Sequence, residues 1–270
     1  MFRLYRFFPT MTECPEPRQA VSGWLYWAFH ILFLPGIAVI LSLDGSILRA
    51  ALWFWAIDLI AVVLIFRRFL GDSLGNFRIY RSECLTALWQ GLLVFAVLCL
   101  PVYLIDGLDG MLGCITGGPF GSQDLTGWTR HVYMDPVSEN LMRMASTSMI
   151  CTEVLTVPVL VLASPVIVGC LYFALGFAPR ADRQPWRGYA AVAAMAAGTS
   201  LLLHLSGGEE LSACVIRYLC QLPFYLCGCW VYQRSNTIWG PILFTAAVNL
   251  LSALIFIAGL TVSYFRWMGL

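Results

Sequence analysis

The chain has 270 residues, of which 60% are hydrophobic and only 11% are charged, and its mean hydropathy is +0.78. A soluble domain of this size carries about a quarter charged residues, so the composition excludes an ordinary soluble protein. A formal net charge of +1 gives no indication of a nucleic-acid partner. Several apolar runs approach the roughly 20 residues that a helix needs to cross a lipid bilayer, which predicts an all-α membrane protein.

The first half of the chain predicts three membrane spans. A short arm over residues 1–21 combines arginines with aromatic residues and is expected at the membrane interface. The spans are expected over 22–43, 46–66 and 84–105, with an arginine-rich loop over 67–83. Tyr26 is assigned to the aromatic belt at the start of the first span. Asp58 lies well inside the second span, where a carboxylate is either functional or paired with a partner such as Gln90 or an arginine.

The second half begins with the longest polar segment, residues 106–140, which contains five acidic residues, one arginine and seven glycines. This content predicts an outer loop and argues against a long helix. Residues 141–178 are apolar but interrupted by prolines, and they are too long for one straight crossing and short for two. Further spans are expected over 189–206, 211–232 and 237–261.

Arginine placement predicts the orientation of these spans, because loops on the cytoplasmic side carry an excess of arginine and lysine. With the N-terminus in the cytoplasm, loops 67–83 and 179–188 lie inside with four and three arginines, and the acidic segment 106–140 lies outside. Every loop then fits a multi-pass protein of a cell membrane with seven crossings, in which 141–178 is one kinked element. Splitting that element at Ser164-Pro165 gives eight crossings and is the alternative.

Three polar or small residues on different helices are expected at a similar depth. Counting from the inner membrane edge at about 1.5 Å per residue places Gly169 roughly 15 Å deep, Asn249 roughly 18 Å deep and His204 roughly 22 Å deep. Gly169 would permit close approach of two backbones. Thr245 lies four residues before Asn249 and shares its helix face. These positions predict one cavity in the middle of the membrane.

Three stretches that contain these residues form a pattern. They are Pro165-Val-Ile-Val-Gly-Cys-Leu-Tyr-Phe173, Ser200-Leu-Leu-Leu-His204, and Ser235-Asn-Thr-Ile-Trp-Gly-Pro-Ile-Leu followed by Asn249. The pattern resembles the CPBP family of intramembrane proteases, which includes type II CAAX prenyl endopeptidases and bacteriocin self-immunity proteins. The resemblance implies a four-helix core within residues 150–270, additional spans within 1–149 and a bacterial source.

The chain departs from the family pattern at the positions that carry the chemistry. The family has paired glutamates, an arginine and a histidine where this sequence has Val168, Gly169, Phe173 and Thr245. In the family a glutamate activates water, and histidine and asparagine residues bind a metal or hold the oxyanion. A general base must reach the water that it activates, which neither valine nor glycine does. A divalent metal such as zinc needs three or four ligands, so it would need partners beyond His204.

Three functions follow as hypotheses. The first is a CPBP-like pseudoenzyme that binds a membrane-embedded peptide, a prenylated peptide or a partner protein, as an immunity or assembly factor does. The second is an active intramembrane endopeptidase with a rearranged site, built on His204 and Asn249 with Glu153, Glu209 or Glu210 as the carboxylate. The third is a component of a transporter.

Overall fold

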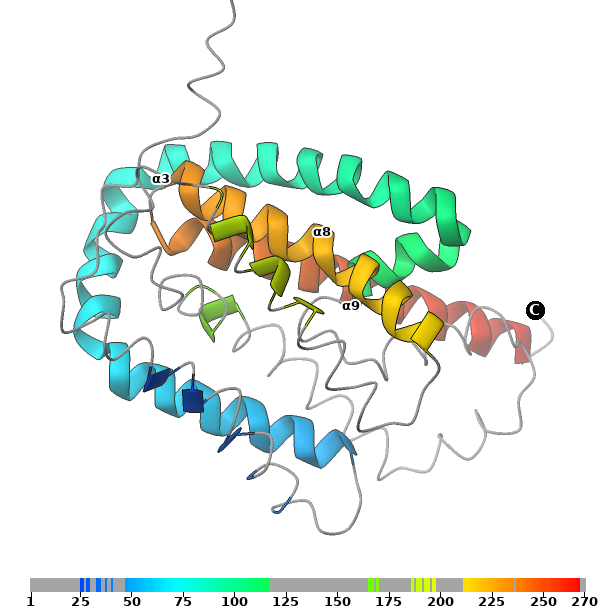
Figure 1. Cartoon of the computed structure of the whole chain (residues 1–270), viewed down its shortest axis with the longest axis horizontal. Coiled ribbons are helices and arrows are strands. Elements are labelled where there is room, and N and C mark those ends of the chain that lie inside the picture. Colours follow the sequence, from blue (N-terminus) through cyan, green and yellow to red (C-terminus); the bar gives the residue numbers. More distant parts are fainter. Residues whose placement is uncertain are drawn as a thin grey trace, which may run out of the picture.

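The computed structural model describes residues 47–116, 211–235 and 237–267, with short pieces between 25 and 40, 165 and 169, and 186 and 197. The described part of the chain is helical and contains no strand, so the all-α class is confirmed there. Three long helices form it: α3 (Ile47–Thr116), α8 (Leu211–Ser235) and α9 (Trp239–Trp267). Each of the three packs against the other two. Figure 1 shows α8 and α9 between two arms of α3.

Helix α3 contradicts the loop that was expected over residues 67–83. This segment is helical, and it joins the second and third predicted spans into one bent element. Figure 1 shows both arms extending to the same side of the bend, so that the chain runs in opposite directions along them. The segment contains no proline, and arginine is a good helix former, so the arginines that suggested a loop are equally compatible with a helix. Arginine content indicates which side of a membrane a segment occupies, but not its conformation.

The polar segment that was expected to form a loop from residue 106 begins as a helix. At Gly107 the backbone leaves the helical region, with φ of 62° and ψ of −144°, and the chain then folds back as a short helix that ends at Thr116. Figure 1 shows this return helix at one end of α3. A Cβ at Gly110 would lie 2.8 Å from the Val102 carbonyl oxygen, so glycine permits the close return. The expected loop is therefore wrong over 106–116, and 117–140 lies outside the described residues.

Helices α8 and α9 confirm two predicted segments. Helix α8 ends three residues beyond the expected 232, and α9 continues six residues beyond the expected 261. In the described part of the chain, Tyr80–Leu108 and Cys214–Ser235 are each long and apolar enough to cross a membrane. The predicted spans over 141–178 and 189–206 are described at only a few positions.

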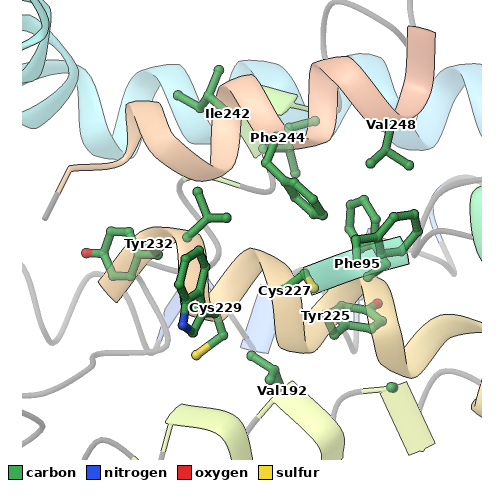
Figure 2. Packing of buried hydrophobic residues seen from close by; sticks show 14 of the residues in the cluster. Phe95, Val192, Tyr225, Cys227, Cys229, Tyr232, Ile242, Phe244 and Val248 are labelled. Atoms are coloured by element: carbon green, nitrogen blue, oxygen red, sulfur yellow. The ribbon is translucent and has the colours of Figure 1, made fainter. Parts of the chain in front are cut away.

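The core lies where the three helices meet, and α8 provides its centre. Phe244 of α9 packs against Phe95 of α3 with ring centroids 5.8 Å apart and against Phe224 of α8 at 5.6 Å. Figure 2 shows Phe95, Phe244 and Cys227 directed into this space. A Cβ at Gly91 would collide with the side chain of Val231, so α3 and α8 are in close contact. Burial of each large side chain contributes about 1.5–3 kcal/mol relative to exposure to water.

The face of the second α3 arm that points away from the core is exposed and largely apolar. It includes Trp89, Leu93, Val97, Leu100 and Leu104, each more than half exposed. Soluble monomers rarely expose a continuous apolar surface along a whole helix, whereas a bilayer covers such a surface without cost.

Candidate functional site

The stretch that carries the family resemblance forms a tight turn between α8 and α9. The Ser235 hydroxyl donates to the Thr237 carbonyl oxygen at 3.0 Å and accepts the Thr237 backbone N–H at 3.4 Å. A Cβ at Gly240 would collide with the Ser235 side chain, so the turn requires glycine there. The Thr237 hydroxyl also lies 3.3 Å from the Cys84 thiol, which ties the turn to α3. This part of the motif therefore fixes where α9 begins.

The tryptophan of this stretch has a similar role. The ring of Trp239 packs on Phe77 of the α3 bend, with centroids 5.0 Å apart. The first turn of α9 is thus held by the bend on one side and by Ser235 on the other. We interpret the segment as the support of a site, because these residues position α9 and the hydroxyls of Ser235 and Thr237 are engaged in holding the turn.

Gly169 lies directly against the beginning of α9. Gly169 is buried, and a Cβ added there would lie 2.6 Å from Cγ1 of Ile242 and 3.2 Å from the Ile238 carbonyl oxygen. Real Cβ atoms do not approach other atoms to 2.6 Å, so even alanine would force Ile242 to move. The close backbone approach that the sequence predicted at Gly169 is confirmed.

The same face of α9 carries Thr245 and Asn249. Ile238, Ile242, Thr245 and Asn249 follow at intervals of four, three and four residues, which places them along one side of the helix. Thr245 is buried, and its hydroxyl has no hydrogen bond to any described residue. Asn249 is half-buried one turn further along. Gly169, Thr245 and Asn249 therefore lie along one side of α9, in that order.

The remaining residues of the predicted site lie outside the described residues. They are Glu153, Val168, Phe173, His204, Glu209 and Glu210. Within the described ranges, no three histidine, cysteine or acidic side chains are arranged to hold a metal ion. The zinc ligand predicted at His204 and the relocated carboxylates stay predictions.

A buried carboxylate lies apart from this region. Asp58 is fully buried on the first arm of α3 and accepts a hydrogen bond of 2.7 Å from the Tyr26 hydroxyl. The partner suggested from the sequence, Gln90, is exposed on the other arm and does not contact Asp58 within the described structure. Tyr26 also packs edge-on against Phe66 at 5.5 Å. The sequence analysis placed Tyr26 in an interface belt and did not predict its hydrogen bond to Asp58, because the sequence does not indicate which polar group a tyrosine hydroxyl will reach.

Sequence reasoning also missed a cluster of three thiols. The seven cysteines that the structure describes are buried thiols outside any disulfide, and three of them, Cys99, Cys114 and Cys220, meet where the return helix packs on α8. Cys114 hydrogen-bonds to both of the others, which together with burial raises the pKa of its thiol above the ordinary value. A Cβ at Gly113 would lie 2.9 Å from the Cys220 sulfur. The cluster depends on the fold-back at Gly107, which the sequence analysis did not foresee.

Compared with models of protein families, with curated proteins and with solved structures, the chain matches none of them.

Proposed function

We propose that this chain is a multi-pass membrane protein of CPBP type that lacks peptidase activity and binds a membrane-embedded peptide along α9. The bundle has seven crossings, with eight as the alternative, and lies in a bacterial cell membrane with its N-terminus in the cytoplasm. Two observations support the membrane placement: the exposed apolar face of Tyr80–Leu108, and two helical segments long enough to span a bilayer.

The packing at Gly169 carries the proposal that the site is not catalytic. The resemblance aligns Gly169 with one of the paired glutamates of the family, in which a glutamate activates water. A carboxylate side chain at this position has no space, because Ile242 and the Ile238 carbonyl already occupy it. Where the family has a glutamate side chain, this chain therefore has a close contact between Gly169 and α9. A general base cannot act from a position filled in this way.

The polar groups on α9 support a binding role. Thr245 stands where the family has histidine, and a buried hydroxyl without a hydrogen bond costs about 1–3 kcal/mol. An extended peptide that enters between the helices offers alternating N–H and C=O groups that fit this hydroxyl, and Asn249 lies one turn further along the same side of α9. A lipid-modified peptide adds an apolar chain that dissolves in the bilayer around the helices. A prenylated peptide is therefore the first ligand to test.

The test uses the full chain in lipid nanodiscs with a farnesylated peptide that carries a fluorophore and a quencher. Binding is followed by fluorescence anisotropy, and cleavage by release of the quencher. We expect binding without cleavage, and about tenfold weaker binding after Asn249→Ala, because one charge-neutral hydrogen bond contributes about 0.5–1.5 kcal/mol. The matched control is Leu250→Ala, which removes a neighbouring side chain that is exposed on the same helix.

Two results would overturn the proposal. Cleavage by the wild type that is lost in His204→Ala would establish a rearranged peptidase, and about one equivalent of zinc lost in the same variant would point to a metal site. Equal binding by wild type, Asn249→Ala and Leu250→Ala would remove α9 from the binding site. Flux of the peptide across vesicles would favour the transporter hypothesis.

A further inference from the structure

The second arm of α3 carries a polar residue on the face that points away from α8 and α9. Gln90 is exposed and lies ten residues beyond Tyr80, the first residue of the apolar span, which is about 15 Å along the helix axis. Its amide makes no hydrogen bond to any residue in the described part of the chain. In the hydrocarbon region water cannot satisfy two N–H donors and a carbonyl acceptor. An amide at this depth therefore requires a partner other than the residues that the structure describes.

The residues around Gln90 follow a regular spacing. We name as the α3 seam the exposed residues at successive intervals of four and three: Thr86, Gln90, Leu93, Val97, Leu100 and Leu104. An average of 3.5 residues is the spacing with which two helices wind around each other. The exposed fractions of Leu93 and Leu104, 68% and 82%, confirm that the seam faces outward. The buried residues Ala87, Phe95 and Cys99 lie on the other side of the same helix.

The seam contains one amide, that of Gln90, whose donor and acceptor groups have no hydrogen-bond partner among the described residues. The Thr86 hydroxyl already donates to the Ser82 carbonyl oxygen at 2.8 Å, so it is satisfied within its own helix. Gln90 is different, because a glutamine side chain in a helix cannot satisfy both its donor and acceptor groups locally. A single polar residue in an otherwise apolar seam fixes the register and the number of helices that associate.

We propose that the α3 seam is the interface of a homodimer, in which Gln90 of one copy pairs with Gln90 of the second. Two copies inserted in the same direction are related by a two-fold axis along the membrane normal. That symmetry brings each residue of the seam to the same depth as its counterpart. Two glutamine amides can pair with each other, because the carbonyl oxygen of each, which carries a partial negative charge, accepts a hydrogen bond from the NH2 group of the other. A second copy thus supplies both the partner and the register.

The dimer is independent of the peptide proposed as ligand. Gln90 lies on α3 and faces outward, whereas Asn249 lies on α9. A failure of peptide binding therefore leaves the dimer intact, and a failure of dimerisation leaves the binding site intact. The two proposals share only the placement of Tyr80–Leu108 in a bilayer.

The helix can bend at Pro101, but the central part of the seam, from Gln90 to Leu100, lies before this proline.

The first test measures association in lipid. Full chains that carry donor or acceptor fluorophores at the C-terminus are mixed in phosphatidylcholine vesicles, and energy transfer is followed as lipid is added. We expect a reversible dimer whose dissociation constant rises about tenfold in Gln90→Leu, since hydrogen bonds between membrane helices contribute about 1–2 kcal/mol in peptides. Gln90→Asn should recover part of the loss. The control Leu85→Ala truncates an exposed side chain of the same helix that is at no interval of three or four residues from the seam.

The second test locates the contact. A photoreactive benzoylphenylalanine replaces Leu93, Val97 or, as control, Leu85 in the reconstituted full chain. We expect dimers cross-linked from the two seam positions and only lipid adducts from Leu85. Energy transfer that is the same in Gln90→Leu and wild type, a monomer at every dilution, or equal cross-linking from all three positions would each overturn the homodimer. In native membranes, a cross-link from Leu93 to a different protein in place of a second copy would do the same.

Discussion

The contact between Gly169 and α9 gives a prediction whose magnitude follows from the structure. Gly169→Ala places a methyl group 2.6 Å from Cγ1 of Ile242 and 3.2 Å from the Ile238 carbonyl oxygen. Forcing extra carbon into a packed contact costs about 1–3 kcal/mol. Alanine regains about 0.5–1 kcal/mol over glycine inside a helix. The net loss in the free energy of unfolding should therefore be about 0.5–2 kcal/mol.

Ile242→Ala makes this prediction specific. On its own the substitution removes buried methyl groups and costs about 2–5 kcal/mol. In the double variant the methyl group added by Gly169→Ala occupies the space that Cγ1 and Cδ1 of Ile242 have left, so the two losses should not add. We expect the double variant to be about 1 kcal/mol more stable than the sum of the single variants, within the usual range for residues in contact.

The assay is reversible unfolding of the full chain in mixed micelles of mild detergent and dodecyl sulfate, followed by circular dichroism. Leu250→Ala is the control partner, because Leu250 is exposed on α9 and away from the contact. Its effect should add to that of Gly169→Ala. If Gly169→Ala stabilises the protein, or if its loss simply adds to that of Ile242→Ala, then Gly169 does not lie against α9 and the argument against a glutamate there fails.

Three further predictions concern other parts of the fold. Gly107→Ala should destabilise the protein by about 1–3 kcal/mol in the same unfolding assay, because φ of 62° with ψ of −144° is a conformation that residues with a Cβ rarely adopt, and the space around Gly107 is open, so backbone strain alone decides the result. No change would mean that the helix does not break there. Tyr26→Phe should lower the free energy of unfolding by about 1–3 kcal/mol, because it removes a hydrogen-bond donor to the buried Asp58 carboxylate. If Tyr26→Phe lowers it by the same amount when Asp58 is already replaced by asparagine, the two residues are not coupled. Cys114 should react with N-ethylmaleimide at pH 8 far more slowly than an exposed thiol, because its raised pKa keeps the thiol neutral and its burial excludes the reagent. Rapid labelling of Cys114, identified by mass spectrometry, would contradict the thiol cluster.

The sequence predicted those parts of the fold that depend on local composition. The apolar runs located α8 and α9 to within a few residues, because a helix that is apolar over many turns leaves a continuous signal along the chain. The expected loop over 67–83 was wrong since arginine is compatible with both loop and helix. The expected loop at 106–116 was wrong because glycines were taken to prevent helix formation, whereas Gly107 turns the chain and a helix follows it.

The candidate site was predictable only where one helix carries it. Thr245 and Asn249 share a face by their spacing, and Gly169 was expected at a close contact because glycine is the smallest residue. The partner of Gly169 was not predictable, since Ile242 lies 73 positions away and nothing in the spacing connects them. The Tyr26–Asp58 pair and the thiol cluster were missed for the same reason. Each joins residues from segments whose relative placement depends on the complete fold.

If the bundle lies in a bilayer, as proposed above, the glycines at its helix contacts have a consequence that differs from what they would have in water. Gly91 against Val231, Gly113 against Cys220 and Gly169 against Ile242 each bring a backbone close to a neighbouring side chain. Separated helices in a bilayer stay surrounded by hydrocarbon, so moving apart exposes no apolar surface to water. Dispersion forces, which fall off steeply with distance, must then hold the helices together. Enlarging any one of these three glycines should therefore cost the bundle more than truncating a lipid-facing leucine.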